Sequence, residues 1–296
     1  MSDIDLRSEL LDLKPFIFGK QAKSGLIQAV QIMGNSIPKR AFTFLCAKPG
    51  EEIYEICITL KDDYEAVSKA TNVLSHAHVN LRAALLSSAV DNSGLGYWAS
   101  FVDLSKAVKG IKQIEEDLRK LDVVQDVKIV RPEPLTCDVV HFPIVNGNSA
   151  ATVMPAELFG SLFDEIEKIL TPSGFAAVFY NAGKKSGVFI AKLFSERYGL
   201  KGDDVLLAMV QATKTIGWGQ IEDLTIDRRK LTGRFKIQSC FEAVLRGYRK
   251  EKICHWTRGF IAGFSSEVVG ESLEAVELKC VAAGDKLCEF EVKPKI

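Results

Sequence analysis

The chain has 296 residues, of which 47% are hydrophobic and 26% are charged, as in an ordinary globular protein. Its 38 basic side chains balance 38 acidic ones, so the net charge gives no indication of nucleic-acid binding. The acidic amino-terminal stretch does not fit a secretory signal, and no apolar run approaches the roughly 18 residues of a membrane span, so we expect a cytoplasmic protein.

The first part of the chain predicts an extension followed by a small domain of strands and helices. Residues 1–45 are the expected N-terminal extension, with a short helix within 24–34 and a strand over 41–46. From residue 51 onwards, alternating apolar positions favour strands, and an apolar period near 3.6 residues favours helices. The expected order is β-α-β-β-α-β, with elements over 51–60, 62–79, 81–90, 97–104, 110–124 and 124–131.

This order is typical of the ferredoxin-like fold, an antiparallel sheet backed by two helices. Over residues 51–133 it resembles the ACT regulatory domain family, and we expect an ACT-like domain at 46–134. The resemblance implies amino-acid binding at a glycine-containing loop after the first strand. The corresponding loop, Lys61-Asp62-Asp63, has no glycine, so a dimerisation or scaffold role is favoured over effector binding.

A linker is expected at 135–150, where an Asn-Gly-Asn turn and a proline interrupt any helical period. The remaining residues, 151–296, predict a second α+β domain. Within its longest expected helix, Gly183 and Gly187 lie one turn apart, which predicts that another backbone or a ligand passes close by. Helices are expected over 155–170, 174–199, 203–217, 239–250 and 256–270, strands over 219–227 and 233–240, and a hairpin over 271–292.

Three cysteines of the second domain are candidates for a shared site. A hairpin turn centred on Gly284 places Cys280 opposite Cys288, with Cβ atoms about 4.5–5.5 Å apart. That distance suits two ligands of one zinc ion, and it also suits a cross-strand disulfide. Cys254, which precedes the last expected helix, would add a third sulfur. Buried, unpaired cysteines in a core are the third interpretation.

The fourth ligand is open between two residues. Glu277 precedes Cys280 by three positions, and an odd offset places the two side chains on opposite faces of a regular strand. Glu277 could therefore join the site only if the strand bulges near Leu278. His255 is the alternative, because imidazole commonly binds zinc and this residue follows Cys254 directly.

The order Cys-x22-Glu-x2-Cys-x7-Cys resembles the 4-vinyl reductase domain family, which includes hydrocarbon-binding proteins of archaea. It also resembles the sensor domains of aromatic-responsive bacterial transcription activators. The resemblance covers 151–296 and implies a structural zinc on Cys254, Glu277, Cys280 and Cys288, since four protein ligands leave no open position for water. It further implies a dimeric fold related to subunits of the TRAPP vesicle-tethering complex, with helices around an apolar pocket.

No nucleotide-binding, serine-hydrolase or metalloprotease motif is present, so no catalytic residue is assigned. We expect a dimeric regulatory protein that senses a small apolar ligand, hydrocarbon-like or aromatic. Control of transcription would need a partner protein, because no DNA-binding motif is visible. An accessory or reductase role on a vinyl-tetrapyrrole and a scaffold with a permanently bound lipid are the alternatives. The candidate ligand-binding residues are aromatic: Tyr180, Phe189, Trp218, Phe235, Phe241 and Trp256.

Overall fold

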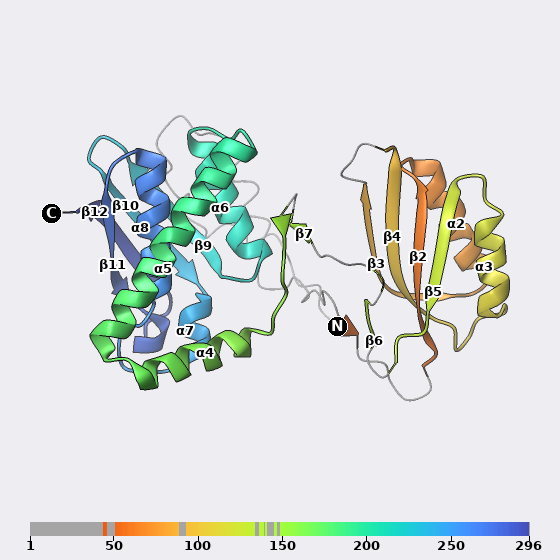
Figure 1. The fold of residues 1–296 in the computed structure, drawn as a ribbon, viewed down its shortest axis with the longest axis horizontal. Coiled ribbons are helices and arrows are strands. Elements are labelled where there is room, and N and C mark those ends of the chain that lie inside the picture. The colour runs from red at the N-terminus through yellow and green to blue at the C-terminus, as the bar shows by residue number, and fades with distance from the viewer. Residues whose placement is uncertain are drawn as a thin grey trace, which may run out of the picture. The chain divides into compact units, whose positions relative to one another are not determined.

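The computed structural model describes residues 44–45, 51–88, 93–133, 136–138, 140, 145–146 and 149–295. The chain separates into two units, one spanning Pro38–Val153 and the other combining Met154–Ile296 with Met1–Ile37 (Figure 1). We call residues 38–153 the amino-terminal unit and residues 154–295 the carboxyl-terminal unit. The expected helix within 24–34 and nearly all of the expected extension, 1–45, lie outside the described residues.

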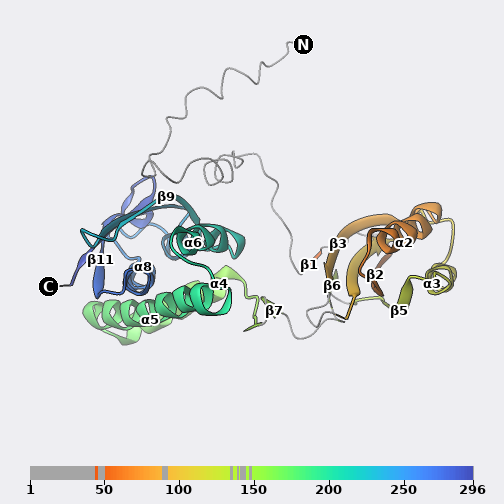
Figure 2. The same ribbon diagram turned by 90° about the horizontal axis from the view of Figure 1, so that it is seen from above.

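The amino-terminal unit contains one antiparallel sheet in the order β3-β4-β2-β5. Both of its described helices lie on the same side of that sheet (Figures 1 and 2). The bounds are β2 Ile53–Lys61, α2 Tyr64–His76, β3 Asn80–Ser88, β4 Leu95–Asp103, α3 Ile111–Arg119 and β5 Val124–Val130. Two short pairs accompany them: β1 Phe44–Leu45 with β6 Thr136–Cys137, and β7 Val145–Asn146 with β8 Ser149–Ala150.

Local signals in the sequence explain the boundaries of α2. The Asp63 side chain accepts a hydrogen bond from the Ala66 N–H at 2.7 Å, which caps the helix, and Glu65 places a negative charge at its positive end. The core beneath α2 and α3 includes Ile56, Leu60, Ile114 and Leu118, none more than 1% exposed. Each such side chain contributes about 1.5–3 kcal/mol by leaving water.

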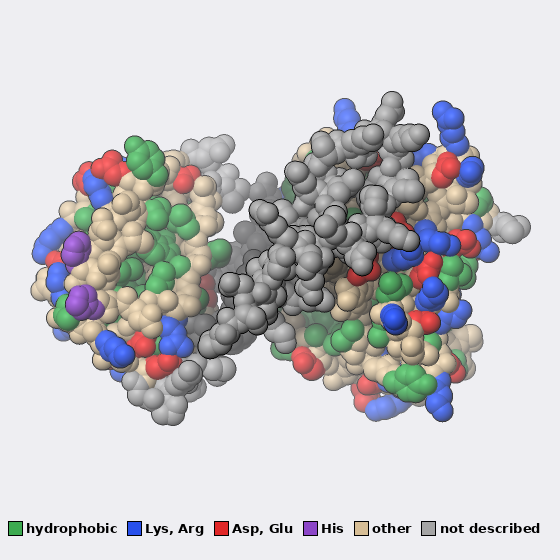
Figure 3. Space-filling model, turned by 180° about the vertical axis from the view of Figure 1, so that it is seen from behind, with side chains coloured by type: hydrophobic (Ala, Val, Ile, Leu, Met, Phe, Trp, Pro, Cys, Tyr) green, Lys and Arg blue, Asp and Glu red, His purple; other side chains and the backbone are tan. Residues whose placement is uncertain are grey.

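Strand β3 is an exposed edge of this sheet. The side chains of Leu81, Leu85 and Leu86 are 46, 64 and 48% exposed. Hydrophobic side chains also gather on the face of this unit that is visible in Figure 3. An apolar edge strand with unpaired backbone groups can pair with another strand, so this surface matters for assembly.

The carboxyl-terminal unit packs helices against a second antiparallel sheet, of order β11-β12-β10-β9. The expected α+β class is therefore confirmed. Helix α8 lies between this sheet and α5 (Figure 2). The bounds are α4 Ala156–Ile169, α5 Pro172–Lys192, the π-helical turn η1 Leu193–Arg197, α6 Asp203–Thr215, β9 Gln220–Asp227, β10 Thr232–Gln238, α7 Phe241–Arg246, α8 His255–Val269, β11 Leu273–Lys279, the 3-10 turn η2 Val281–Ala283 and β12 Cys288–Pro294.

Helices α5 and α8 touch backbone to backbone. A Cβ atom added to Gly183 would lie 2.0 Å from the Trp256 carbonyl oxygen, and one added to Gly187 would lie 2.1 Å from that of Phe260. Gly259 of α8 mirrors this arrangement, 2.0 Å from the Tyr180 carbonyl oxygen. The close approach predicted from the glycine spacing is thus confirmed, and the neighbour is a helix.

Two sequence-based boundaries are wrong. The helix expected over 239–250 covers only Phe241–Arg246, because Gly247 adopts φ of +65° and ends it. In the closing hairpin, β11 ends at Lys279, and the next residues form η2 instead of continuing the strand. The second difference shapes the site described below. Among the described residues, no helix is both long and apolar enough to cross a membrane.

Candidate metal centre

Four ligand-type side chains meet in the interior of the carboxyl-terminal unit. Cys254 immediately precedes α8, Glu277 lies in β11, Cys280 precedes η2, and Cys288 begins β12. One ligand atom from each lies within 4.8 Å of all the others, and all four residues are buried. The unit thus contains a cluster of three cysteines and one glutamate that could bind a metal.

The sulfur geometry matches that of thiolates sharing one ion. The Cys254 Sγ atom lies 3.7 Å from that of Cys280 and 3.8 Å from that of Cys288. Two sulfurs bound tetrahedrally to zinc at about 2.3 Å each are about 3.8 Å apart. A disulfide would need about 2.05 Å, and all three are free cysteines. The spacing therefore favours ligands over a disulfide.

Glu277 reaches the cluster because β11 is irregular. Pairing with β12 runs Glu277 to Phe290 and then Lys279 to Glu289, so Leu278 is the extra residue of a bulge. The bulge predicted near Leu278 is confirmed. It breaks the strict alternation of side chains and lets Glu277 and Cys280 share one side of the chain.

One oxygen of Glu277 is left without a hydrogen bond. Its Oε2 atom accepts from the Cys254 N–H at 3.1 Å, whereas Oε1 is buried and has no partner. A buried, unsatisfied polar atom costs about 1–3 kcal/mol, so Oε1 suits a cation. Among the residues that could hold a metal, this carboxylate therefore fits as well as the thiols do.

The electrostatics of the cluster also favour a cation. Burial raises the pKa of the Glu277 carboxyl to about 9. A hydrogen bond from Cys254, reinforced by one from Cys288, lowers the pKa of the Cys280 thiol. Several negative charges cannot share this buried space by themselves, whereas a divalent cation would stabilise all of them.

His255, the alternative fourth ligand, is not part of the cluster. Its ring instead packs edge-on against Phe175, with ring centroids 5.9 Å apart. Burial lowers the pKa of His255 to about 4. The helix turn that follows Cys254 directs the imidazole toward α5, so adjacency in sequence does not bring it to the thiols.

Two residues that support this centre escaped the sequence analysis. Glu242 of α7 accepts hydrogen bonds from the Trp256 N–H at 3.0 Å, the Thr257 N–H at 2.9 Å and the Thr257 hydroxyl at 2.9 Å. It thereby caps α8 and holds the residues next to Cys254, and burial raises its own pKa to about 8. Cys240 lies beside Cys254, with 3.9 Å between the two Sγ atoms. Only the turn between β10 and α7 reveals either contact.

Three of the six candidate aromatic residues come together next to the metal centre. The Trp218 and Trp256 rings meet edge to face at 4.9 Å, and Phe241 lies 5.9 and 5.4 Å from them. Phe260 joins at 5.3 Å from Trp256. We call these four residues the aromatic cluster. Because Trp256 is two positions from Cys254, one segment serves both features.

The other three candidates lie apart from the cluster centre. Tyr180 of α5 packs beside Arg258, whose guanidinium carbon is 5.1 Å from the ring centroid. Phe235 is fully buried in the sheet core, and Phe189 is 62% exposed on α5. Apolar character alone does not separate a core residue from an exposed one.

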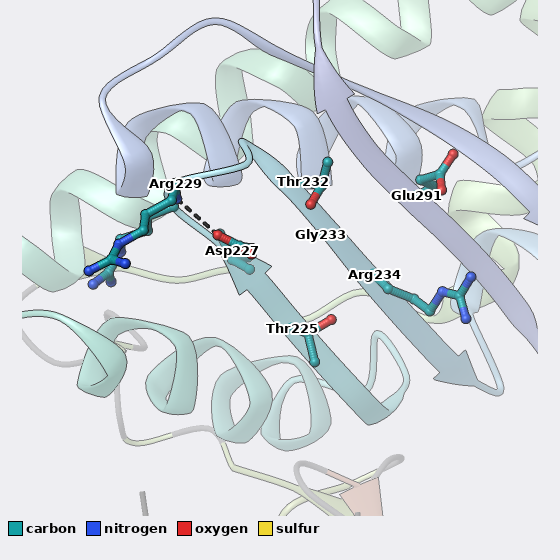
Figure 4. Close-up of a pocket in the computed structure, with 9 residues that line it drawn as sticks. Thr225, Asp227, Arg229, Thr232, Gly233, Arg234 and Glu291 are labelled. Atoms are coloured by element: carbon teal, nitrogen blue, oxygen red, sulfur yellow. Dashed lines mark hydrogen bonds between the residues drawn. The ribbon is translucent and has the colours of Figure 1, made fainter. Parts of the chain in front are cut away.

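Two hollows open on the described surface of this unit. The larger, of about 690 Å³, lies over β9, β10 and β12 and is lined by polar side chains, including Thr225, Arg229 and Arg234 (Figure 4). The smaller, of about 230 Å³, lies where η1, α6 and α8 meet and includes Leu200 and Val205. Neither is lined by any of the six candidate aromatic residues.

Comparisons with known proteins centre on the same region. An uncharacterized protein of Methanocaldococcus jannaschii is 27% identical over 142 residues, covering 48% of this chain and 76% of its own length. The phenol regulator MopR of Acinetobacter guillouiae is 26% identical over 199 residues, covering 64% of this chain, which spans only about a third (34%) of that regulator. The crystal structure of the phenol-responsive sensory domain of the transcription activator PoxR aligns over 50% of this chain and 78% of that one, with 22% identity and a TM-score of 0.44.

The family comparison covers every ligand-type residue of the cluster. The family model for the 4-vinyl reductase domain matches residues 234–294, a range that includes Cys254, Glu277, Cys280 and Cys288. The resemblance inferred from the spacing of these residues is thereby confirmed. The carboxyl-terminal region of this chain is a 4-vinyl reductase domain.

Proposed function

We propose that this protein is a regulatory sensor that binds a small apolar ligand, hydrocarbon-like or aromatic, in its carboxyl-terminal unit. The observation that carries the proposal is the 4-vinyl reductase domain together with the similarity to a phenol regulator over 199 residues. Ligand binding would favour one conformation of the unit, and a partner protein would read that conformation.

Zinc is the proposed metal, held by Cys254, Glu277, Cys280 and Cys288. Sulfur spacing of 3.7–3.8 Å and the unpartnered Glu277 oxygen support it. The ion would act structurally, because four protein ligands fill a tetrahedral site and leave none for water. It would connect the start of α8 to β11 and β12, so metal binding would contribute directly to folding.

The aromatic cluster is the proposed ligand contact. Trp218, Phe241 and Trp256 offer three ring faces beside the metal centre, and Tyr180 supplies a hydroxyl on neighbouring α5. Small-molecule sites combine such apolar surface with a few polar groups. Phe189 and Phe235, one exposed and the other in the sheet core, are left out of this contact set.

The amino-terminal unit is proposed to be a ferredoxin-like, ACT-like module for dimerisation or regulation. The element order β2-α2-β3-β4-α3-β5 and the sheet order β3-β4-β2-β5 support this proposal. The exposed leucines of edge strand β3 would lie in the dimer contact. For the carboxyl-terminal unit, a TRAPP-subunit-like arrangement of helices on one antiparallel sheet is proposed in the same way.

Ligand binding is testable on the purified full chain. Native mass spectrometry detects any co-purifying apolar molecule, and a panel of phenols, alkanes and isoprenoids is screened by thermal shift. We expect at least one compound to raise the Tm of the wild type. Trp218→Ala should abolish that shift, whereas Trp98→Phe, in the amino-terminal unit, should leave it intact. A panel without any shift, in a protein that carries no bound molecule, would sink the sensor proposal.

A further inference from the structure

Cys240 is a fourth buried thiol at the edge of the metal centre. It precedes α7 and is 1% exposed. Its Sγ atom lies 3.9 Å from the Cys254 Sγ and 3.5 Å from the Thr257 hydroxyl oxygen. Cys254 is therefore surrounded by three sulfurs, of which only two belong to the proposed ligand set.

The distance from Cys240 to Cys254 is close to that between ligand sulfurs. Cys280 and Cys288 lie 3.7 and 3.8 Å from Cys254, against 3.9 Å for Cys240. All of these match the spacing of about 3.8 Å expected on one tetrahedral zinc. Glu277 and Cys240 thus both adjoin the three-sulfur group, and a four-coordinate ion has room for only one of them.

Building on the proposed zinc site, we propose that Cys240 is an alternative fourth ligand that replaces Glu277. In the exchange, the bond from the Glu277 oxygen to the metal breaks and a bond from the Cys240 sulfur forms. The proton of the Cys240 thiol passes to the released carboxylate, so the total charge of the centre is unchanged. Softer metals favour the four-sulfur arrangement, because thiolates are soft ligands.

The exchange would connect the metal centre to the aromatic cluster. Cys240 is bonded directly to Phe241, whose ring stacks on Trp218 at 5.9 Å. The Phe241 N–H also donates to the Trp218 carbonyl oxygen at 2.9 Å. A molecule that displaces these rings would shift the start of α7 and with it the Cys240 thiol. Occupancy of the aromatic cluster would thereby select the fourth ligand.

Cobalt substitution counts the thiolates in the full-length protein. Co²⁺ replaces zinc, and the sulfur-to-cobalt charge-transfer absorbance increases with the number of bound thiolates. We expect Glu277→Gln to retain cobalt and to raise this absorbance by about a third, the change from three sulfurs to four. The rise should vanish in Glu277→Gln/Cys240→Ser, which should also lose metal to a chelator sooner. Cys57→Ser, which removes a buried thiol of the amino-terminal unit, is the matched control and should not prevent the rise.

Different outcomes overturn different claims. A wild type without any sulfur-to-cobalt band would contradict the metal centre itself. A wild type with three thiolates, combined with a Glu277→Gln variant that gains none, would overturn only the role of Cys240. If Glu277→Gln does not fold, cadmium NMR on protein with Glu277 intact decides: Cys240→Ser must move the ¹¹³Cd resonance and Cys57→Ser must not. An unmoved resonance in Cys240→Ser would also overturn the proposal.

Discussion

The contact between α5 and α8 makes a quantitative prediction for Gly259→Ala. The new Cβ would lie 2.0 Å from the Tyr180 carbonyl oxygen, where an unstrained carbon–oxygen contact needs about 3.3 Å. The helices must therefore separate by about 1.3 Å, the difference between the two values. The obstacle is backbone, so no side-chain rotation relieves it.

The expected free-energy change combines two opposing effects. Overpacking of a core costs about 1–3 kcal/mol, and a backbone clash belongs at the upper end. Alanine recovers about 1 kcal/mol through its higher helix propensity. The net loss is about 2 kcal/mol, which lowers the Tm of a unit of this size by roughly 4–8 °C. Because α8 begins next to Cys254, resistance of the bound metal to a chelator should fall as well.

Gly160→Ala is the matched control on α4. Its added Cβ would meet the Leu245 carbonyl oxygen at 3.7 Å and the Leu245 Cβ at 3.8 Å, both ordinary contacts. The same substitution should therefore stabilise the protein there by up to about 1 kcal/mol. Thermal unfolding followed by circular dichroism compares the two variants. A Tm for Gly259→Ala equal to that of the wild type would refute backbone contact between the helices.

Three further predictions concern metal, pH and assembly. Cys280→Ser should reduce bound zinc, measured by elemental analysis, and lower the Tm, whereas Cys57→Ser should retain zinc; full zinc in Cys280→Ser would contradict the ligand set. Because the pKa of Glu242 is raised to about 8 in the folded protein from 4.5, this carboxyl binds a proton more tightly when folded, so its contribution to stability is present below about pH 4.5 and is lost as pH rises toward 8. Glu242→Gln should therefore flatten the decline of unfolding free energy between these pH values, and a profile parallel to that of the wild type would refute the assignment. Leu85→Lys, at a position 64% exposed on β3, should shift a dimer toward monomer in light scattering with little change in Tm; an unchanged mass would exclude β3 from the contact.

Local patterns predict much of the secondary structure because local chemistry determines it. Alternating apolar residues define strands such as β2, and Asp63 marks the start of α2 through a hydrogen bond only three residues long. Cysteine spacing likewise indicates the metal cluster, since ligands separated by a hairpin turn are brought together by that turn. The paired glycines of α5 predict close contact, because a missing side chain is itself a local signal.

What the sequence determined by itself is thus the order of elements, the α+β class and the identity of the cysteines that gather. The tertiary structure decided which fourth group stands beside them. Glu277 is turned toward the thiols by a bulge at Leu278, and Cys240 is brought to Cys254 by the packing of α7 against the start of α8. It also decided that Phe189 is exposed while Trp218 joins Trp256. These outcomes depend on contacts between residues distant in the chain, which no local periodicity encodes.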